Sequence, residues 1–442
     1  MKRIFCAAAA LFAALCFPFA PLAGWEPDFD VEADEVYLLN LDTGTVVYEK
    51  NADTPHAIAS LTKMMTGLLL LESGEDLNTT ITIPQRLEEE FETIKEWDGA
   101  YLDLQVGEEI RLKDLLYSTL LPSTNDTASA IADYLSGGDI PAFVEQMNRR
   151  AGELGCENTH FTCPHGLYDE GNYSTARDLA LIAGACLENE AFMEVVTTPS
   201  YWLPATNLHT QPRSADAPEG YYLELFSTIQ LQLPDSPLYR PYARGIKTGF
   251  TDAAGRCLVT TAETENGSYL LVLLGAPNRK DENGVQVSFD TAASLLDWAL
   301  DRFETGSLPE AGQPLATLPL NYCKESETVE VYANGQLSGL FWDRENPPEY
   351  RFNLPESVNA PVAEGQALGT LTLYQDGQPL GTLELTAGAG YERSALLYWK
   401  ARLAPLSGWL AVAALFLAAL VLLVILSARR RARRRRRHVY RR

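Results

Sequence analysis

One apolar stretch near the C-terminus restricts what this chain can fold into more than any other feature. Residues 403–428 carry no charge, and Gly408 to Leu426 is long enough to cross the hydrocarbon core of a bilayer as a helix. In that core only a helix or a closed barrel satisfies the backbone N–H and C=O groups. The sequence therefore predicts a transmembrane helix at 403–428.

The residues behind this stretch give it a direction. Residues 429–442 include ten arginines and no acid, and segments rich in Lys and Arg remain on the cytoplasmic side of a membrane. We therefore expect a single-pass cell-membrane protein with a cytoplasmic Arg-rich tail and an extracytoplasmic body. The arginines are interpreted as a stop-transfer and lipid-contact signal, not as a nucleic-acid site.

The opposite end of the chain is typical of a secretory signal peptide. A basic pair precedes the apolar run Ile4 to Phe17, and Ala20 and Ala23 are small residues placed before a cleavage point. We predict a signal peptide at 1–23. An uncleaved N-terminal membrane helix is the alternative.

The charge of the body excludes one class of partner. The chain has a formal net charge of −24, although its two ends contribute twelve positive charges and no negative one. The body alone therefore stands at −36 and repels phosphate. No nucleic acid is expected as a partner.

The seven cysteines indicate neither a disulfide framework nor a metal site. Two of them fall in the predicted signal peptide, and the other five are irregularly spaced. The sequence leaves open whether Cys156 and Cys163 pair. No metal and no cofactor is expected.

The change of pattern along the body predicts a mixed α/β (α+β) protein. Short β-rich runs come first, a mostly helical region extends from about 72 to 190, and strands return after 240. From 308 the pattern is that of a small β-rich domain, so we expect domains at 24–307 and 308–390. The expected elements include strands at 35–40, 46–50, 244–248, 257–264 and 268–274, and helices at 112–121, 128–135 and 291–303.

Ser60 and Lys63 form the first candidate for catalysis. At the start of a helix, residues three positions apart leave the same face. A serine hydroxyl needs a neighbouring base to become a nucleophile, and a desolvated lysine near a second cation can be that base. The same spacing is also common by chance.

The second candidate, Ser123-Thr124-Asn125, lies in a loop expected over 122–126 between two helices. Ser123 can hold or relay a proton, and the amide of Asn125 can donate to a substrate carbonyl. These residue types also favour an ordinary turn with a helix cap.

The third candidate is Lys247-Thr248-Gly249. Lys247 can attract a carboxylate and lower the pKa of Lys63, and Thr248 can hydrogen-bond the same carboxylate. Gly249 lets a ligand backbone approach the strand. Alternation places Lys247 and Thr248 on opposite faces, so both reach one site only if the cleft lies along the edge of the strand.

These three motifs, in this order, resemble those of the serine penicillin-recognising enzymes. The flanking residues are similar to the low-molecular-mass penicillin-binding proteins that are D-alanyl-D-alanine carboxypeptidases, over roughly 31 to 387. The stretches that carry the resemblance are Ala59 to Thr66, Cys163 to Leu167, Tyr173 to Leu179 and Lys247 to Gly255. The resemblance implies a β-lactamase/transpeptidase-like domain with an antiparallel sheet and a helical subdomain, followed by a small all-β domain.

The resemblance also implies a reaction. Ser60 would be the acylated nucleophile and Lys63 its base, with Ser123 and Asn125 on the other side of the cleft. The substrate would be the peptidoglycan stem pentapeptide, from which the terminal D-alanine is removed. β-Lactams would be inhibitors that acylate Ser60.

Further roles are implied for the residues that bind the substrate. Lys247 and Thr248 would meet the terminal carboxylate, and the oxyanion hole would use the backbone N–H groups of Ser60 and Phe250. An arginine soon after the third strand helps with the carboxylate in some members of the family, and Arg279 is the candidate here.

Three residues depart from the family pattern. Thr124 stands where Gly is usual, Cys163 where Asn is usual, and Asn172 where His is usual. None of them removes a catalytic group, so they bear on rate and cleft shape. His165, a lone histidine, is interpreted as structural.

Two alternatives accompany the carboxypeptidase. A β-lactamase would share the motifs, but no Glu is placed to activate a deacylating water, and the β-rich domain and anchor are out of place there. A penicillin-binding sensor or wall scaffold without activity is the other.

Overall fold

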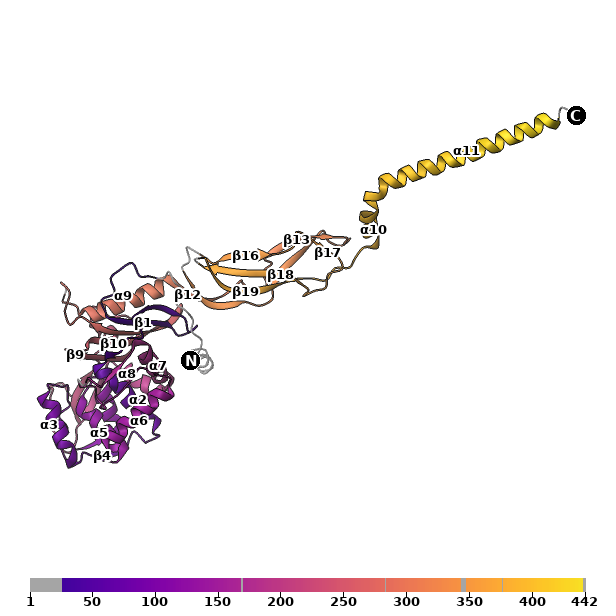
Figure 1. Cartoon of the computed structure of the whole chain (residues 1–442). Coiled ribbons are helices and arrows are strands. Elements are labelled where there is room, and N and C mark those ends of the chain that lie inside the picture. The colour runs from indigo at the N-terminus through magenta and orange to yellow at the C-terminus, as the bar shows by residue number, and fades with distance from the viewer. Residues whose placement is uncertain (1–25, 168–169, 283, 343–346, 376, 440–442) are drawn as a thin grey trace. The chain divides into compact units, whose positions relative to one another are not determined.

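A computed structural model of the chain describes residues 26–439 except 168–169, 283, 343–346 and 376. The predicted signal peptide and the end of the Arg-rich tail lie outside the described residues. The chain divides into two compact units, one of 1–306 with 338–347 and one of 307–337 with 348–442 (Figure 1).

The first unit is built on an antiparallel sheet with the strand order β2-β1-β11-β10-β9. The strands predicted at 35–40 and 46–50 are confirmed, and the three later ones extend beyond their predicted ends. β9 pairs with β10 along one edge, and no further strand of the described residues joins its other edge. The bounds are β1 (Glu35–Asn40), β2 (Val46–Lys50), β9 (Ala243–Thr251), β10 (Gly255–Thr264) and β11 (Gly267–Ala276).

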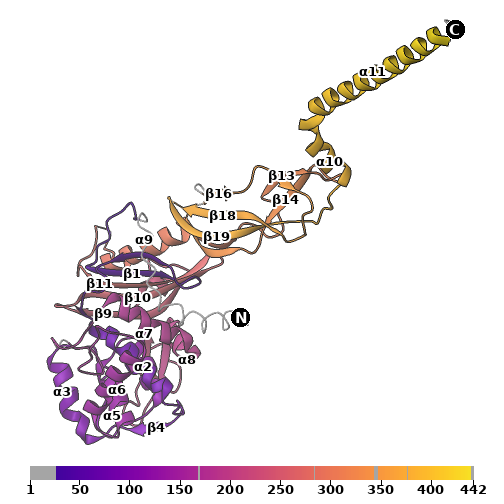
Figure 2. The ribbon, with the colours of Figure 1, turned by 45° about the vertical axis from the view of Figure 1, so that its right-hand side comes forward.

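Helices cover both faces of this sheet (Figures 1 and 2). Helix α9 (Val287–Arg302) lies on one face, where Leu258 of β10 packs in the same cluster as Phe289. The neighbouring Val259 belongs to the cluster on the other face, which contains the remaining helices. Alternation along β10 thus separates two cores.

The helical half surrounds α2 (Lys63–Glu72), whose Met64, Met65 and Leu68 are fully buried. Helix α5 begins at Asn125, so the loop expected over 122–126 is shorter than predicted. The other bounds are η1 (Ala59–Thr62), η2 (Gln85–Leu87), α3 (Glu88–Glu96), α4 (Leu112–Leu120), α5 (Asn125–Ser136), α6 (Ile140–Glu153), α7 (Ala176–Glu188), α8 (Glu190–Val196) and η3 (Gln230–Gln232). Short strand pairs are β3 (His56–Ala57) with β6 (Tyr173–Ser174), β4 (Thr80–Thr82) with β5 (Glu109–Arg111), and β7 (Ser200–Pro204) with β8 (Tyr221–Phe226).

The second unit is β-rich, and its core is formed by Val329, Val331, Leu371, Leu373 and Leu385, all fully buried. Its main sheet has the order β16-β18-β19-β14-β13-β17. The bounds are β13 (Ala316–Asn321), β14 (Thr328–Ala333), β16 (Glu349–Asn353), β17 (Val358–Asn359), β18 (Ala367–Gln375) and β19 (Gln378–Ala387). A separate pair, β12 (Phe303–Leu308) with β15 (Leu337–Trp342), belongs mostly to the first unit.

Two helices end the chain. Helix α10 (Ala395–Leu403) is joined through η4 (Ala404–Leu406) to α11 (Ser407–Val439). The part of α11 from Ala411 to Arg431 is long and apolar enough to cross a membrane.

Candidate active site

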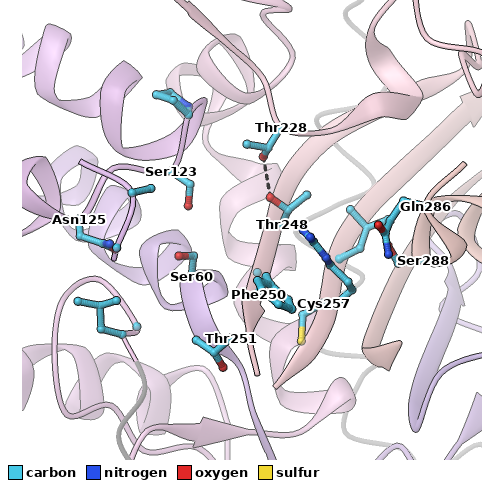
Figure 3. Close-up of a pocket in the computed structure, with 18 of the residues that line it drawn as sticks. Ser60, Ser123, Asn125, Thr228, Thr248, Phe250, Thr251, Cys257, Gln286 and Ser288 are labelled. Carbon is cyan, nitrogen blue, oxygen red and sulfur yellow. Dashed lines mark hydrogen bonds between the residues drawn. The ribbon is translucent and has the colours of Figure 1, made fainter. Parts of the chain in front are cut away.

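A cleft of about 1150 Å³ brings the three sequence motifs together. Ser60 lies at the start of the helical half, Ser123 and Asn125 lie on one side of it, and Thr248 and Phe250 lie on the other (Figure 3). Because β9 is an edge strand, its residues can form one wall of a cleft. From the sequence, Lys247 and Thr248 were expected to reach one site only if the cleft lies along the edge of their strand, and β9 is such an edge strand.

Lys63 lies at the centre of a hydrogen-bond cluster. Its Nζ lies 2.8 Å from Ser60 Oγ, and it donates to Asn125 Oδ1 at 2.6 Å and to the backbone oxygen of His165 at 2.6 Å. The lysine is fully buried, whereas Ser60 lines the cleft. The serine hydroxyl is thus open to a ligand on one side and in contact with an amine on the other.

The surroundings favour the neutral form of this amine. Burial lowers the pKa of Lys63 well below its ordinary value, and the nearby charge of Lys247 lowers it further. A neutral amine at hydrogen-bond distance can accept the hydroxyl proton of Ser60.

Ser123 and Lys247 form a second pair across the cleft. Lys247 Nζ donates to Ser123 Oγ at 2.7 Å and to the backbone oxygen of Thr248 at 3.0 Å. Lys247 is fully buried, and burial lowers its pKa to about 7. Ser123 has a φ of +70°, a region that side chains rarely adopt. Such backbone strain is held by the surrounding structure and gathers at functional sites.

The start of α5 fixes the position of Asn125. The backbone N–H of Asn125 donates to Ala100 at 2.8 Å. The buried carboxylate of the next residue, Asp126, accepts the backbone N–H groups of Leu102, Asp103 and Leu104 at 3.0 Å each. The segment that carries Trp97 to Ala100 along the cleft is therefore clamped to the residue beside Asn125.

Gly249 also has a packing role within the chain. A Cβ at this position would lie 2.8 Å from the backbone oxygen of Ile58. The glycine thus lets the chain's own turn before Ser60 approach β9, because any side chain would push the two apart. Gly166 acts in the same way, since its Cβ would overlap the backbone oxygen of Ala59.

The three departures from the family pattern have local hydrogen-bond partners. Thr124 Oγ1 donates to the backbone oxygen of Ser118 at 2.8 Å. Cys163 Sγ accepts the N–H of Gly166 at 3.2 Å and is a free thiol, as is Cys156. Asn172 donates to Thr62 Oγ1 at 3.0 Å. Of these contacts, the one made by Asn172 reaches the turn that carries Ser60.

The expectation that Arg279 lies in this cleft is corrected by the structure. The backbone oxygen of Arg279 accepts from Gln286 Nε2 at 2.9 Å and from the N–H of Val287 at 3.2 Å. Its side chain is directed away and pairs with Glu32, in a separate surface hollow. Arg256, which the sequence did not single out, lines the cleft instead.

Two other contacts were missed, one from a loop that the sequence did not single out and one from a backbone oxygen. Thr228 Oγ1 lies 2.6 Å from Thr248 Oγ1 (Figure 3). His165 contributes its backbone oxygen to Lys63, while its ring contacts Glu90 and the N–H of Leu167. A backbone acceptor leaves no signal in a single sequence. Among the described residues, no cluster of His, Cys, Asp and Glu is arranged to hold a metal ion.

A serine hydroxyl beside a desolvated lysine is the arrangement of a serine acyl-transfer enzyme. A family model described as D-alanyl-D-alanine carboxypeptidase matches residues 23–278, and one described as the C-terminal domain of penicillin-binding protein 5 matches residues 303–393. The chain belongs to the D-alanyl-D-alanine carboxypeptidase family of serine peptidases. The resemblance seen in the motifs is thereby confirmed.

Individual relatives agree with this. The D-alanyl-D-alanine carboxypeptidase DacF of Bacillus subtilis is 30% identical over 368 residues, which is 80% of this chain and 85% of that protein. Penicillin-binding protein 5 of Haemophilus influenzae is 25% identical, with a TM-score of 0.56 over 84% of this chain and 100% of that one. A mutant of the Streptomyces K15 DD-transpeptidase is 28% identical, with a TM-score of 0.51 over 61% of this chain and 96% of that one.

Proposed function

We propose that this protein removes the terminal D-alanine from peptidoglycan stem pentapeptides through an acyl-enzyme on Ser60. The contact that supports this most directly is the one between Lys63 Nζ and Ser60 Oγ at 2.8 Å, since it places a desolvated amine on an exposed hydroxyl. Membership of the family indicates the class of substrate, and the geometry of the cleft supports the choice of Ser60 and Lys63 as the reacting residues.

In the first step, Lys63 takes the proton of Ser60, and Ser60 Oγ attacks the carbonyl carbon between the two D-alanines. The C–N bond breaks, and the leaving amine takes a proton and departs as D-alanine. Ser123 lines the cleft and accepts a hydrogen bond from Lys247, so its hydroxyl can deliver that proton. Water then releases the tetrapeptide from Ser60.

Developing negative charge on the carbonyl oxygen needs N–H donors. We assign this role to the backbone N–H groups of Ser60 and Phe250, which both line the cleft. The side chain of Asn125 is held by Lys63 and is placed to contact the substrate backbone.

We also propose that α11 anchors the protein in the cell membrane, with the catalytic unit outside and the C-terminus in the cytoplasm. The candidate span Ala411–Arg431 is apolar up to Ala428, and the Arg-rich tail begins at Arg429. Stem peptides are then within reach of a tethered enzyme.

The test uses the full-length chain in detergent, a fluorescent penicillin and a D-Ala-D-Ala-terminated peptide. We expect a long-lived adduct on the wild type, none on Ser60→Ala, and release of D-alanine by the wild type alone. An unlabelled wild type, or undiminished labelling of Ser60→Ala, would refute the assignment. Rapid turnover of penicillin indicates the β-lactamase alternative, and labelling without D-alanine release indicates the sensor.

A further inference from the structure

The proposed substrate ends in a free carboxylate, and the two motif lysines are poorly suited to bind it. Lys63 and Lys247 are fully buried, and neither lines the cleft. Lys247 already donates to Ser123 and to its own strand. With a pKa of about 7, it is only partly protonated near neutral pH. The cleft therefore needs another cation for this carboxylate.

Arg256 lies on the same face of the sheet as Thr248. In the β9–β10 pairing, Arg256 is opposite Phe250, and Leu258 is opposite Thr248. Opposed residues of an antiparallel pair share a face, so Arg256 and Thr248 are diagonal neighbours about 7–8 Å apart, within reach of a long side chain. Both residues line the cleft.

The guanidinium of Arg256 has donors to spare. Its Cζ lies 4.2 Å from the ring centroid of Phe250, and its Nε donates to Asn278 Oδ1 at 2.9 Å. No carboxylate among the described residues pairs with it, whereas Arg279 pairs with Glu32. Stacking on Phe250 fixes the guanidinium plane, and its terminal N–H groups remain available for a bidentate contact with a carboxylate.

Hydroxyl groups complete the site around Thr248. Thr248 and Thr228 share one hydrogen bond at 2.6 Å, so one of their two hydroxyl hydrogens remains free to donate to an anion. Ser288, at the start of α9, and Gln286 line the same part of the cleft, on the side of Thr248 away from Ser60 (Figure 3). Donors thus gather on one side of the nucleophile within the same cleft.

We propose that Arg256, together with the Thr228–Thr248 hydroxyl pair, binds the terminal carboxylate of the substrate and selects peptides with a free C-terminus. The proposal rests on the proposed function for the identity of the peptide. In this proposal, the arginine that binds the carboxylate is Arg256 of β10, and not Arg279 as expected from the sequence.

The test compares Arg256→Gln with wild type in the full-length protein, on two matched pairs of compounds. One pair is a D-Ala-D-Ala peptide and its C-terminal amide, and the other is a fluorescent penicillin and its carboxylate ester. For Arg256→Gln, we expect a roughly 10- to 100-fold lower kcat/KM for the acid peptide, chiefly through KM, as loss of a hydrogen bond to a charged group gives. The amide should be unaffected, so the preference for the acid disappears. Arg256→Lys should restore part of it.

Arg279→Gln is the matched control, since it removes an arginine that the structure places outside the cleft. It should retain the full preference. If Arg256→Gln still discriminates acid from amide and acid from ester as the wild type does, the proposal is overturned. If the wild type is labelled by penicillin but releases no D-alanine, the proposed function fails, and Arg256 is judged by the penicillin pair. If the wild type prefers neither acid, no carboxylate site exists here.

Discussion

The two units of this protein treat buried polar groups in opposite ways. In the catalytic unit, Lys63, Lys247 and Asp126 are buried at 0%, 0% and 2% exposure. The two lysines donate to residues of the cleft, and Asp126 accepts from backbone N–H groups. In the described part of the β-rich unit, the interior is apolar, and Gln375 is the one buried polar residue. Burying charged groups lowers the free energy of unfolding. The catalytic unit therefore keeps its site at a cost in stability, whereas the apolar interior of the β-rich unit carries little of that cost.

The largest expected effect separates function from stability in the catalytic unit. Lys63→Met removes the proposed base and should lower the rate of Ser60 acylation by about 10²- to 10⁴-fold. The thermal stability near pH 7 should be retained, because folding no longer requires a lysine to lose its proton. Penicillin labelling and calorimetry measure the two quantities. Full activity without this amine would contradict its role.

The second prediction concerns the β-rich unit. Leu371→Ala leaves a cavity in a fully buried position and should cost about 2–5 kcal/mol of that unit's unfolding free energy. The acylation rate of Ser60 at 25 °C should not change. Leu270→Ala, at an equally buried position in β11, is the matched control that should destabilise the catalytic unit. Equal loss of acylation in both variants would mean that the units are not independent.

A smaller effect is expected where a buried polar group is structural. Asp126→Asn retains the shape of the side chain, but it replaces one carboxylate oxygen by an NH₂ group. That group would face backbone N–H groups which the carboxylate accepts in the wild type. About 1–3 kcal/mol of stability should be lost. Acylation should also slow, because the segment beside Asn125 loosens. If the variant unfolds at a lower temperature but acylates Ser60 at the wild-type rate, the hydrogen bonds of Asp126 do not affect the active site.

The smallest predicted effect is a shift in pH dependence. Ser60 acylation should fall toward acid pH as Lys63 becomes protonated. Lys247→Met should move this limb to higher pH, because the charge of Lys247 lowers the pKa of Lys63. In the wild type, Lys247 also makes stability rise with pH between about 7 and the ordinary lysine pKa, since only the unfolded chain binds its proton there. That slope should weaken in Lys247→Met, and an unmoved acid limb would refute the coupling.

Local pattern was enough to predict much of the fold. Short runs rich in β-forming residues set the ends of β1 and β2. The start of α5 at Asn125 was missed, because the same polar residues that suggested a loop also satisfy N–H groups at a helix start.

The site was predictable only where side chains carry the chemistry. Ser60, Lys63, Ser123, Asn125 and Thr248 were marked by type and spacing. Four of them line one cleft, and the buried Lys63 contacts Ser60 and Asn125. The backbone oxygen of His165 has no sequence signature. Arg279 was chosen by its position along the chain, but the backbone around it directs its side chain away from the cleft. Arg256 emerges only from the pairing register of two strands.

The open edge of β9 has a wider consequence. Unpaired strand edges attract other extended chains, which makes them an aggregation hazard on most surfaces. Here the turn before Ser60 lies so close to β9 that a Cβ at Gly249 would touch it. A slender peptide can pair with the remaining edge through main-chain groups alone. Recognition of that kind depends on the peptide backbone and tolerates changes in the peptide's side chains.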